Sequence, residues 1–412
     1  MASARLSRPL AIRLTASYYL SGTVIGPLVE NFHDLCWLPL LGFLVVDGLL
    51  KQGWRQVMAC SFLMLLVRED AGLTLFSLGL WASLRRPGAR AIGLMVMAMS
   101  LVYVAVMTGW IQPQFDSSLS DRFLQEKFGH LLQGRTGGTF TVLWTMVTHP
   151  LRLLAALVSP PGTTLAFLLA PALPLAFIPF VSLDVALMVA VPLFIALVSQ
   201  GMSALSVTLR YVLALVPGLF MGAMLWWQAH PGFWSHLWFR RFWTGCLALG
   251  LVLTLASNPH RTFSALVPDS FSPLVHVSPV AMLQRAATAR HAVGLVPDNA
   301  SVAADTPLLP LLAEREVALR FPKNIEYYNR QDQIESVQWV LAFPGYYRSL
   351  MPLFRQETSR WRSINKALQE LIDEGRYGVV SCADGLVVLR NGVESSSDAR
   401  RCLDALLALE PG

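Results

Sequence analysis

The chain has 412 residues, of which 54% are hydrophobic and only 14% carry a charge. Soluble globular proteins usually carry roughly 25% charged residues, so the composition excludes an ordinary soluble protein and indicates an integral membrane protein. The net charge of +6 comes from a basic excess beside apolar runs, which is an orientation signal rather than a nucleic-acid signal. No basic patch with interleaved aromatic residues occurs in the sequence, and we expect no nucleic-acid partner.

The first apolar segment runs from about Pro9 to Val29, after Arg5 and Arg8. It predicts a single retained membrane helix, either a signal-anchor or a first span, because no small-residue cleavage site stands out. The segment ends in a polar cluster from Glu30 to Asp34 that includes His33.

A charged triplet, Arg68-Glu69-Asp70, interrupts the next apolar stretch. We expect helices over about residues 35–50, 56–67, 71–85 and 91–110, so the triplet lies between two of them. Placing charges in the hydrocarbon core costs roughly 2.5–3.5 kcal/mol each, which puts the triplet at a membrane surface or in a wet cavity. Taken alone, the stretch fits both a polar turn and an acidic functional site.

Basic residues recur in every second loop, at about residues 5–8, 51–55 and 85–90. Cytoplasmic loops are enriched in Lys and Arg, so these loops are expected inside. The cluster from Glu30 to Asp34 and the triplet then share the outer face. Two acidic clusters on one side strengthen the functional interpretation.

The segment at about 112–160 is less apolar, and its amphipathic parts predict helices that lie on the outer membrane face. Spans resume over about residues 164–180, 183–198, 207–227 and 242–257, which gives about nine spans, several of them shorter than the roughly 20 residues that cross a bilayer upright. Arg210 fits either snorkelling to the headgroups or substrate contact. Five tryptophans predict an interfacial aromatic belt: Trp226, Trp227, Trp234, Trp238 and Trp243.

After about residue 258 the composition becomes that of a small α/β layer domain. We expect helices at 279–293, 307–316 and 359–374, the first capped by Ser278, and strands at 301–304, 317–321, 338–343, 377–382 and 386–390. The domain has no glycine-rich nucleotide motif, which favours a structural or substrate-covering role. Cys382 and Cys402 could pair if the domain lies outside the cytoplasm, and the five cysteines show no metal-site spacing.

Four parts of the chain carry a family likeness: the cluster from Glu30 to Asp34 before an apolar helix, the run LLVREDAGLTLFSLGLWASLRR, residues 206–211 with VLALVPGLFMGAML, and parts of residues 298–315. They resemble the polytopic bacterial membrane protein family known as domain of unknown function 2079. The likeness covers most of the chain, and the triplet with its flanks is its most specific part.

That family is similar to the GT-C class of membrane glycosyltransferases, which use polyprenyl-phosphate sugars as donors outside the cytoplasm. The apolar spans and the change in composition predict a polytopic helical bundle over residues 1–257 and an extracytoplasmic α/β domain over residues 258–412. The resemblance implies, in addition, a GT-C-like bundle with an acidic site on the outer face of the cell membrane. A carboxylate there can act as general base on an acceptor hydroxyl, and a cation can stabilise the departing phosphate. The residues assigned to catalysis are Glu69, Asp70, Glu30 and Asp34. The residues assigned to substrate binding are Arg68, His33, Arg210 and Tyr211.

GT-C enzymes generally carry an acid in the first outer loop, whereas Glu30 corresponds by motif to a later loop. The resemblance therefore implies a chain that begins inside the family pattern, either truncated or completed by a partner chain that supplies the N-terminal loop. Three hypotheses remain open. The first is a glycosyltransferase in which Glu69 and Asp70 position the acceptor or a divalent cation. The second is a non-catalytic remnant or partner subunit of a lipid-sugar pathway, and the third is a transporter.

Overall fold

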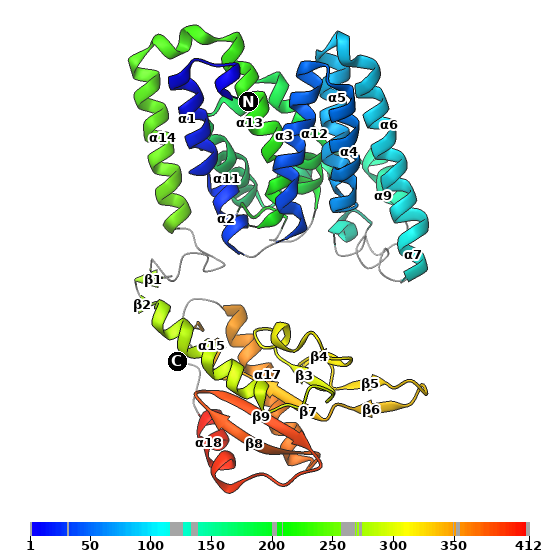
Figure 1. Cartoon of the computed structure of the whole chain (residues 1–412), viewed down its shortest axis with the longest axis vertical. Helices are drawn as coiled ribbons and strands as arrows, with labels where there is room; N and C mark the ends of the chain where they lie inside the picture. The colour runs from blue at the N-terminus through cyan, green and yellow to red at the C-terminus, as the bar shows by residue number, and fades with distance from the viewer. Residues whose placement is uncertain are drawn as a thin grey trace. The chain divides into compact units, whose positions relative to one another are not determined.

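The computed structural model describes residues 2–30, 33–115, 127–132, 139–199, 204–207, 209–256, 268, 270–271, 274–348, 350–351 and 355–408. The chain divides into two compact units, Met1–Thr262 and Phe263–Gly412, drawn in blue to green and in yellow-green to red in Figure 1. Each unit has its own apolar core.

All regular secondary structure among the described residues of the first unit is helical. Its α-helices are α1 (Arg8–Tyr19), α2 (Gly22–Glu30), α3 (Leu38–Lys51), α4 (Trp54–Val67), α5 (Ala71–Arg85), α6 (Arg90–Val106), α7 (Gln112–Phe115), α9 (Thr139–Thr148), α10 (Pro150–Leu157), α11 (Pro161–Ala172), α12 (Leu183–Val198), α13 (Val216–Ala229) and α14 (Leu237–Ala256). Residues 127–132 are also helical. Short 3-10 turns include η2 (Asp34–Trp37), η7 (Arg210–Ala214) and η8 (Pro231–Ser235).

Small residues bring the central helices close together. Helix α5 packs against α6 and α12, α12 against α13, and α13 against α3, as Figure 1 shows. A Cβ atom added to Gly79 would lie 2.8 Å from the Gly93 carbonyl oxygen, and one added to Gly222 would lie 2.7 Å from the Val185 backbone nitrogen. Backbone approach through glycine is typical of helices that pack in membranes, where small residues drive association.

One described helix, Pro87–Phe115, is long and apolar enough to cross a membrane. Pro150–Leu157 and Pro161–Leu175, bent by 63°, would add a second if they form one span. Helices Trp54–Val67 and Leu183–Val198 are apolar but shorter than the roughly 20 residues of an upright span. Within the described residues, helix length and composition therefore do not reproduce the expected count of about nine spans.

The single helix predicted from Pro9 to Val29 is wrong, because α1 ends at Tyr19 and α2 begins at Gly22. Hydroxyl groups cluster at this break: Ser21 Oγ lies 2.6 Å from Thr23 Oγ1, and both side chains are buried. A buried hydroxyl pair and a glycine thus interrupt an otherwise apolar segment.

Two later predicted spans also have different limits. The span predicted at 164–180 ends as a helix at Ala172, because Ala176 and Phe177 take left-handed backbone angles, with φ of 52° and 61°. The span predicted at 207–227 begins as an α-helix only at Val216. Pro217 opens that helix, consistent with the preference of proline for the first helical turn.

The predicted aromatic belt is wrong for two of its five members. Trp227 and Trp243 are both 0% exposed, and their rings stack with centroids 5.2 Å apart and planes 7° apart. Trp238 is 62% exposed, as a belt residue requires, and Trp226 and Trp234 are half-buried.

The second unit is built on a five-stranded sheet with the order β4-β3-β7-β9-β8. The strands are β3 (Val302–Ala304), β4 (Ala318–Arg320), β7 (Trp339–Ala342), β8 (Tyr377–Ala383) and β9 (Leu386–Asn391). Strand β3 pairs in parallel with β4 and β7, whereas β9 pairs antiparallel with β7 and β8. Two hairpins complete the strands: β1 (Ser270–Phe271) with β2 (Leu274–Val275), and β5 (Glu326–Tyr328) with β6 (Ile334–Ser336).

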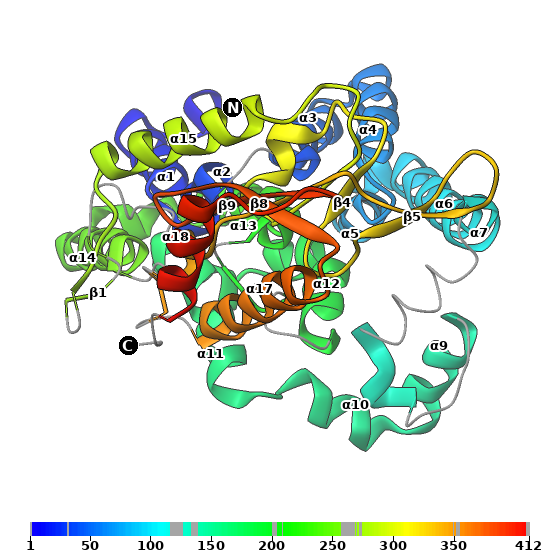
Figure 2. The ribbon, with the colours of Figure 1, turned by 90° about the horizontal axis from the view of Figure 1, so that it is seen from below.

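Helices cover both faces of this sheet. They are α15 (Pro279–Gly294), α16 (Pro344–Arg348), α17 (Arg355–Asp373) and α18 (Ser397–Leu407). Alternate strand residues point to opposite sides, so that Val340 and Leu389 join one core and Leu341 and Val388 join the other. Figure 2 shows α15 on one side of the sheet and α17 on the other.

The five predicted strands of this unit are confirmed, as is the long helix α17. Ser278 caps α15, since its Oγ accepts a hydrogen bond from the Ala281 N–H at 3.2 Å. The helix predicted at 307–316 is wrong, because only Leu309–Leu312 forms a short 3-10 turn. The sequence did not predict the hairpin β5–β6 or the helices α16 and α18. Cys382 and Cys402 form a disulfide that ties β8 to α18.

Candidate functional site at the α4–α5 turn

The charged triplet forms the turn between α4 and α5. Asp70 occupies the N-cap position of α5, but within the described chain its carboxylate makes no capping hydrogen bond. It lies instead beside Arg68, whose Nε is 3.4 Å from Asp70 Oδ1 and 3.8 Å from Glu69 Oε1. One guanidinium is therefore shared by two carboxylates.

A second turn, η2, adds a third carboxylate to this group. Turn η2 contacts α4, and Asp34 interacts electrostatically with both Arg68 and Asp70. Asp34 Oδ1 accepts a hydrogen bond from the Leu35 N–H at 2.9 Å, which fixes the carboxylate at the start of the turn.

A third turn, η7, brings a second guanidinium. Arg210 Nη1 lies 2.9 Å from His33 Nε2, and Arg210 Nη2 donates to the Tyr211 hydroxyl at 3.3 Å. Because arginine only donates, His33 Nε2 accepts this hydrogen bond. The Lys127 ammonium lies 5.4 Å from the centre of the Tyr211 ring, a cation–π contact.

We call these residues the turn cluster: His33, Asp34, Arg68, Glu69, Asp70, Arg210 and Tyr211. Burial raises the pKa of the Asp70 carboxyl, Arg68 opposes the shift, and Glu69 and Asp34 add to it. Burial lowers the pKa of Arg68, but the carboxylates of Asp70 and Glu69 reverse this, and the net pKa is raised. Asp70 thus accepts a proton more readily than an exposed aspartate, which suits a general base.

The structure brings together seven of the eight site residues predicted from the sequence. Glu30 ends α2, which contacts η7, and its side chain lies outside the described residues. The hydrogen-bond partner of His33 is Arg210. Lys127 and Tyr103, which interacts electrostatically with Glu69, were missed, since no local sequence pattern marks either residue.

The donor groups of the turn cluster do not match a metal site held by protein side chains alone. Among the described residues, no three or more His, Cys, Asp or Glu side chains are arranged to hold a metal ion. We therefore assign no chemical step to a metal.

The second unit holds one buried acid that the sequence did not single out, Asp305. It is 0% exposed at the carboxyl end of β3, and its Oδ2 accepts the Phe343 N–H at 2.7 Å. Burial raises the pKa of Asp305 to about 7, against the opposing effect of the hydrogen bonds from Phe343 and Leu308. The hydrogen bond from Phe343 joins the end of β7 to the end of β3, so we assign Asp305 a structural role.

An apolar helical unit with glycine-mediated helix contacts, a candidate span and a charged turn cluster defines a protein of the helical membrane class. The chain belongs to the family described as "Predicted membrane protein (DUF2079)", which matches residues 1–388. The match extends into β9, and it confirms the resemblance of the sequence to this family. No curated protein and no solved structure gave a significant match.

Proposed function

We propose that this protein is a multi-pass glycosyltransferase of the GT-C type, which takes a sugar from a polyprenyl-phosphate donor at the turn cluster. The observation that carries this proposal is that three separate turns supply three carboxylates and two guanidinium groups to one end of the helical unit. Acids that move a proton and cations that bind phosphate are the two kinds of group that this reaction needs.

The contacts support a division of roles. Arg68 is engaged by two carboxylates, whereas Arg210 Nε is buried without a hydrogen-bond partner in the described part of the chain. We assign Arg210 to the donor phosphate and Asp70 to the acceptor. Asp70 takes the hydroxyl proton, the acceptor oxygen bonds to the anomeric carbon, and the bond between that carbon and the phosphate oxygen breaks with its electron pair on the phosphate.

The direction of α14 supports a location of the turn cluster outside the cytoplasm. Arg13 Nη1 of α1 donates a hydrogen bond to the backbone carbonyl oxygen of Arg240 in α14, and Thr254 of α14 lies against Gly22 of α2. Helix α14 therefore runs parallel to α1 and α2, and the chain leaves it at the end where α2 leads to the turn cluster.

The residues after α14 form the unit with the Cys382–Cys402 disulfide, and disulfides persist in oxidising compartments. The basic loops lie at the opposite end of the helices, as expected for a cytoplasmic side. Both signals favour an extracytoplasmic C-terminal domain and a protein of the inner cell membrane. In this proposal the short helices also cross the membrane. They do so where the bilayer is locally thinned, or as two consecutive helices that together form one bent span.

The test uses the full chain reconstituted in lipid nanodiscs with short-chain polyprenyl-phosphate sugars as donors and an extract of the native membrane as the source of the acceptor hydroxyl. Mass spectrometry measures released polyprenyl phosphate. We expect release by the wild type and a loss of about 100-fold or more in Asp70→Asn, in the range of general-base catalysis. Asp398→Asn, at a side chain that is 85% exposed in the second unit, is the matched control. Equal rates in Asp70→Asn and the wild type would contradict the assigned role. Absence of release from every donor would favour a non-catalytic subunit.

The break between α1 and α2 favours a second candidate, a transporter, because discontinuous helices line the binding sites of many transporters. Proteoliposomes separate the two proposals. Uptake of a polyprenyl-linked or free sugar without release of polyprenyl phosphate would contradict the glycosyltransferase proposal and support the transporter proposal.

A further inference from the structure

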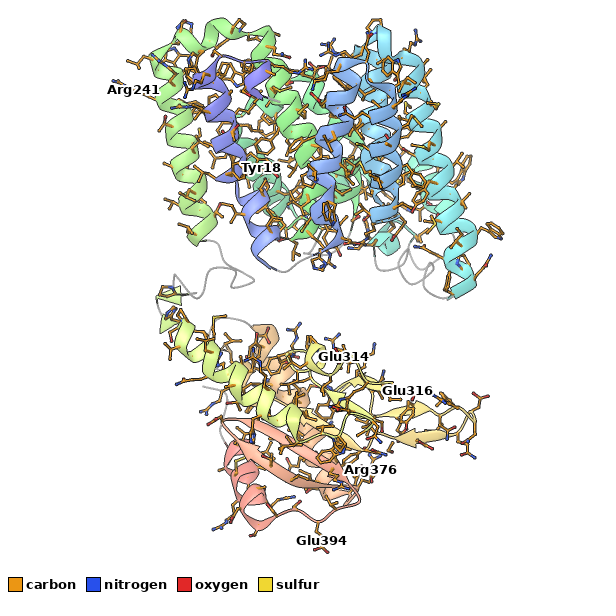
Figure 3. All side chains as sticks on the ribbon, in the orientation of Figure 1. Tyr18, Arg241, Glu314, Glu316, Arg376 and Glu394 are labelled. Atoms are coloured by element: carbon orange, nitrogen blue, oxygen red, sulfur yellow. A yellow bond between two sulfur atoms is a disulfide. The ribbon has the colours of Figure 1, made fainter. Side chains whose placement is uncertain are left out.

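At the end of the helical unit opposite the turn cluster, two arginines approach one tryptophan. The guanidinium carbon of Arg13 lies 5.4 Å from the Trp234 ring centroid, and that of Arg240 lies 5.8 Å from the same ring. Arg13 comes from α1, Trp234 from η8 and Arg240 from the first turn of α14. Figure 3 shows Arg241, the neighbour of Arg240, at this end of α14.

Several contacts fix this arrangement. Arg13 Nη1 donates to the Arg240 carbonyl oxygen at 2.6 Å, and Arg13 also lies 5.8 Å from the Trp243 ring centroid. Trp243 is fully buried, stacks on Trp227 and donates through Nε1 to the Pro174 carbonyl oxygen at 2.8 Å. The guanidinium groups of Arg13 and Arg240 are therefore held against packed aromatic rings rather than against mobile side chains.

The two guanidinium groups interact with each other as like charges. In the described residues, neither forms an ion pair with an acid, and the Arg240 Nε is buried without a hydrogen-bond partner. The acids at this end are engaged elsewhere, Asp47 with Lys51 and Asp184 with Arg85. Tryptophan faces attract cations, but they use none of the N–H donors, so those that Arg13 does not direct to the Arg240 carbonyl oxygen remain available.

We infer that Arg13, Trp234 and Arg240 form a binding site for a phosphate-bearing anion, with the headgroup of an anionic phospholipid as its source. Planar guanidinium groups bind phosphate oxygens with directed, charge-assisted hydrogen bonds. Exposed apolar side chains continue from the site along α14, with Trp238 62%, Phe242 44% and Leu249 51% exposed. This surface suits acyl chains, and basic pockets between membrane helices are known places for anionic headgroups.

The test measures lipid binding to the full chain, purified in detergent and stripped of lipid, by native mass spectrometry. Phosphatidylglycerol, phosphatidylethanolamine with the same acyl chains, and inorganic phosphate are the three probes. We expect phosphatidylglycerol to bind at least ten-fold more tightly than phosphatidylethanolamine, and Arg240→Gln to remove most of this preference. Arg241→Gln removes the same charge one residue away, at an exposed side chain. We expect it to change the preference for phosphatidylglycerol by less than two-fold.

Arg240→Lys keeps the charge but loses the planar fork, and we expect it to retain part of the preference, so the inference remains testable if Arg240→Gln does not fold. Equal effects of Arg240→Gln and Arg241→Gln, or no preference for phosphatidylglycerol in the wild type, would overturn the site. Displacement of the lipid by millimolar inorganic phosphate would overturn the lipid headgroup as the source and assign the site to a soluble phosphate. Since the turn cluster is not involved, this outcome is independent of the proposed glycosyl transfer.

Discussion

The buried carboxyl of Asp305 makes the stability of the second unit depend on pH. Its pKa is raised from 3.8 to about 7 in the folded state, because burial disfavours the charged form. The unfolded chain exposes the group and restores its ordinary pKa. Because the folded-state pKa is the higher one, the stabilising contribution is complete below about pH 4 and is lost as the pH rises through about 7.

The size of the effect follows from the two pKa values. Integrating proton binding between pH 5.5 and pH 8 gives a loss of about 2 kcal/mol in the free energy of unfolding. Asp305→Asn cannot titrate, so this loss should disappear. An asparagine can still accept the Phe343 N–H that Asp305 Oδ2 now accepts.

Hydrogen exchange of the full chain in detergent measures the effect locally. Protection of the amides of β3 and β7, corrected for the pH dependence of intrinsic exchange, gives the free energy of opening at each pH. The control is Asp398→Asn, which removes a carboxyl that is 85% exposed and should keep the wild-type slope. Equal protection free energies at pH 5.5 and pH 8 in the wild type would refute the reasoning, as would an unchanged slope in Asp305→Asn.

Three further predictions concern stability. Gly222→Ala should lower the stability of the helical unit by about 1–3 kcal/mol in thermal unfolding, because the Cβ of the new alanine would overlap the backbone of α12. The control is Gly245→Ala, where the space around the added Cβ is open, and it should be neutral or stabilising. Cys382 and Cys402 should resist alkylation until the protein is reduced, and replacing both by Ser should cost the second unit about 3 kcal/mol, as expected for a loop of this length. Ser278→Ala should cost about 1 kcal/mol by loss of the N-cap bond, seen as faster hydrogen exchange in the first turn of α15; unchanged exchange would contradict this role.

The sheet of the second unit shows which strands a local sequence pattern can predict and which it cannot. Short apolar runs between turn residues located β3, β7 and β9 correctly, because their side chains enter cores on both faces. The hairpin β5–β6 was missed because its residues are largely exposed and carry no apolar pattern. The parallel pairing of β3 with both β4 and β7 joins distant segments, and no short-range signal encodes it.

The turn cluster was likewise predicted only in part from the sequence. Positive loops placed the triplet and Asp34 at one end of the helices, and the structure brings these residues together. The bond between Arg210 and His33 joins residues 177 positions apart, which the sequence alone could not show. A snorkelling arginine and an arginine that meets a histidine look the same in a linear sequence, because both lie beside an apolar run.

Helix α14 shows why the tryptophan belt was predicted wrongly. Its buried side chains, Phe239, Trp243, Cys246 and Thr254, follow helical spacing, while Trp238, Phe242, Leu249, Val252 and Leu253 are exposed. Both sets are mainly apolar, so polarity cannot tell the packed face from the outer one. In a soluble helix the exposed face would be polar. A helix that is apolar on both faces but packed on only one is expected where the second face meets lipid, and this favours α14 as a lipid-contacting helix.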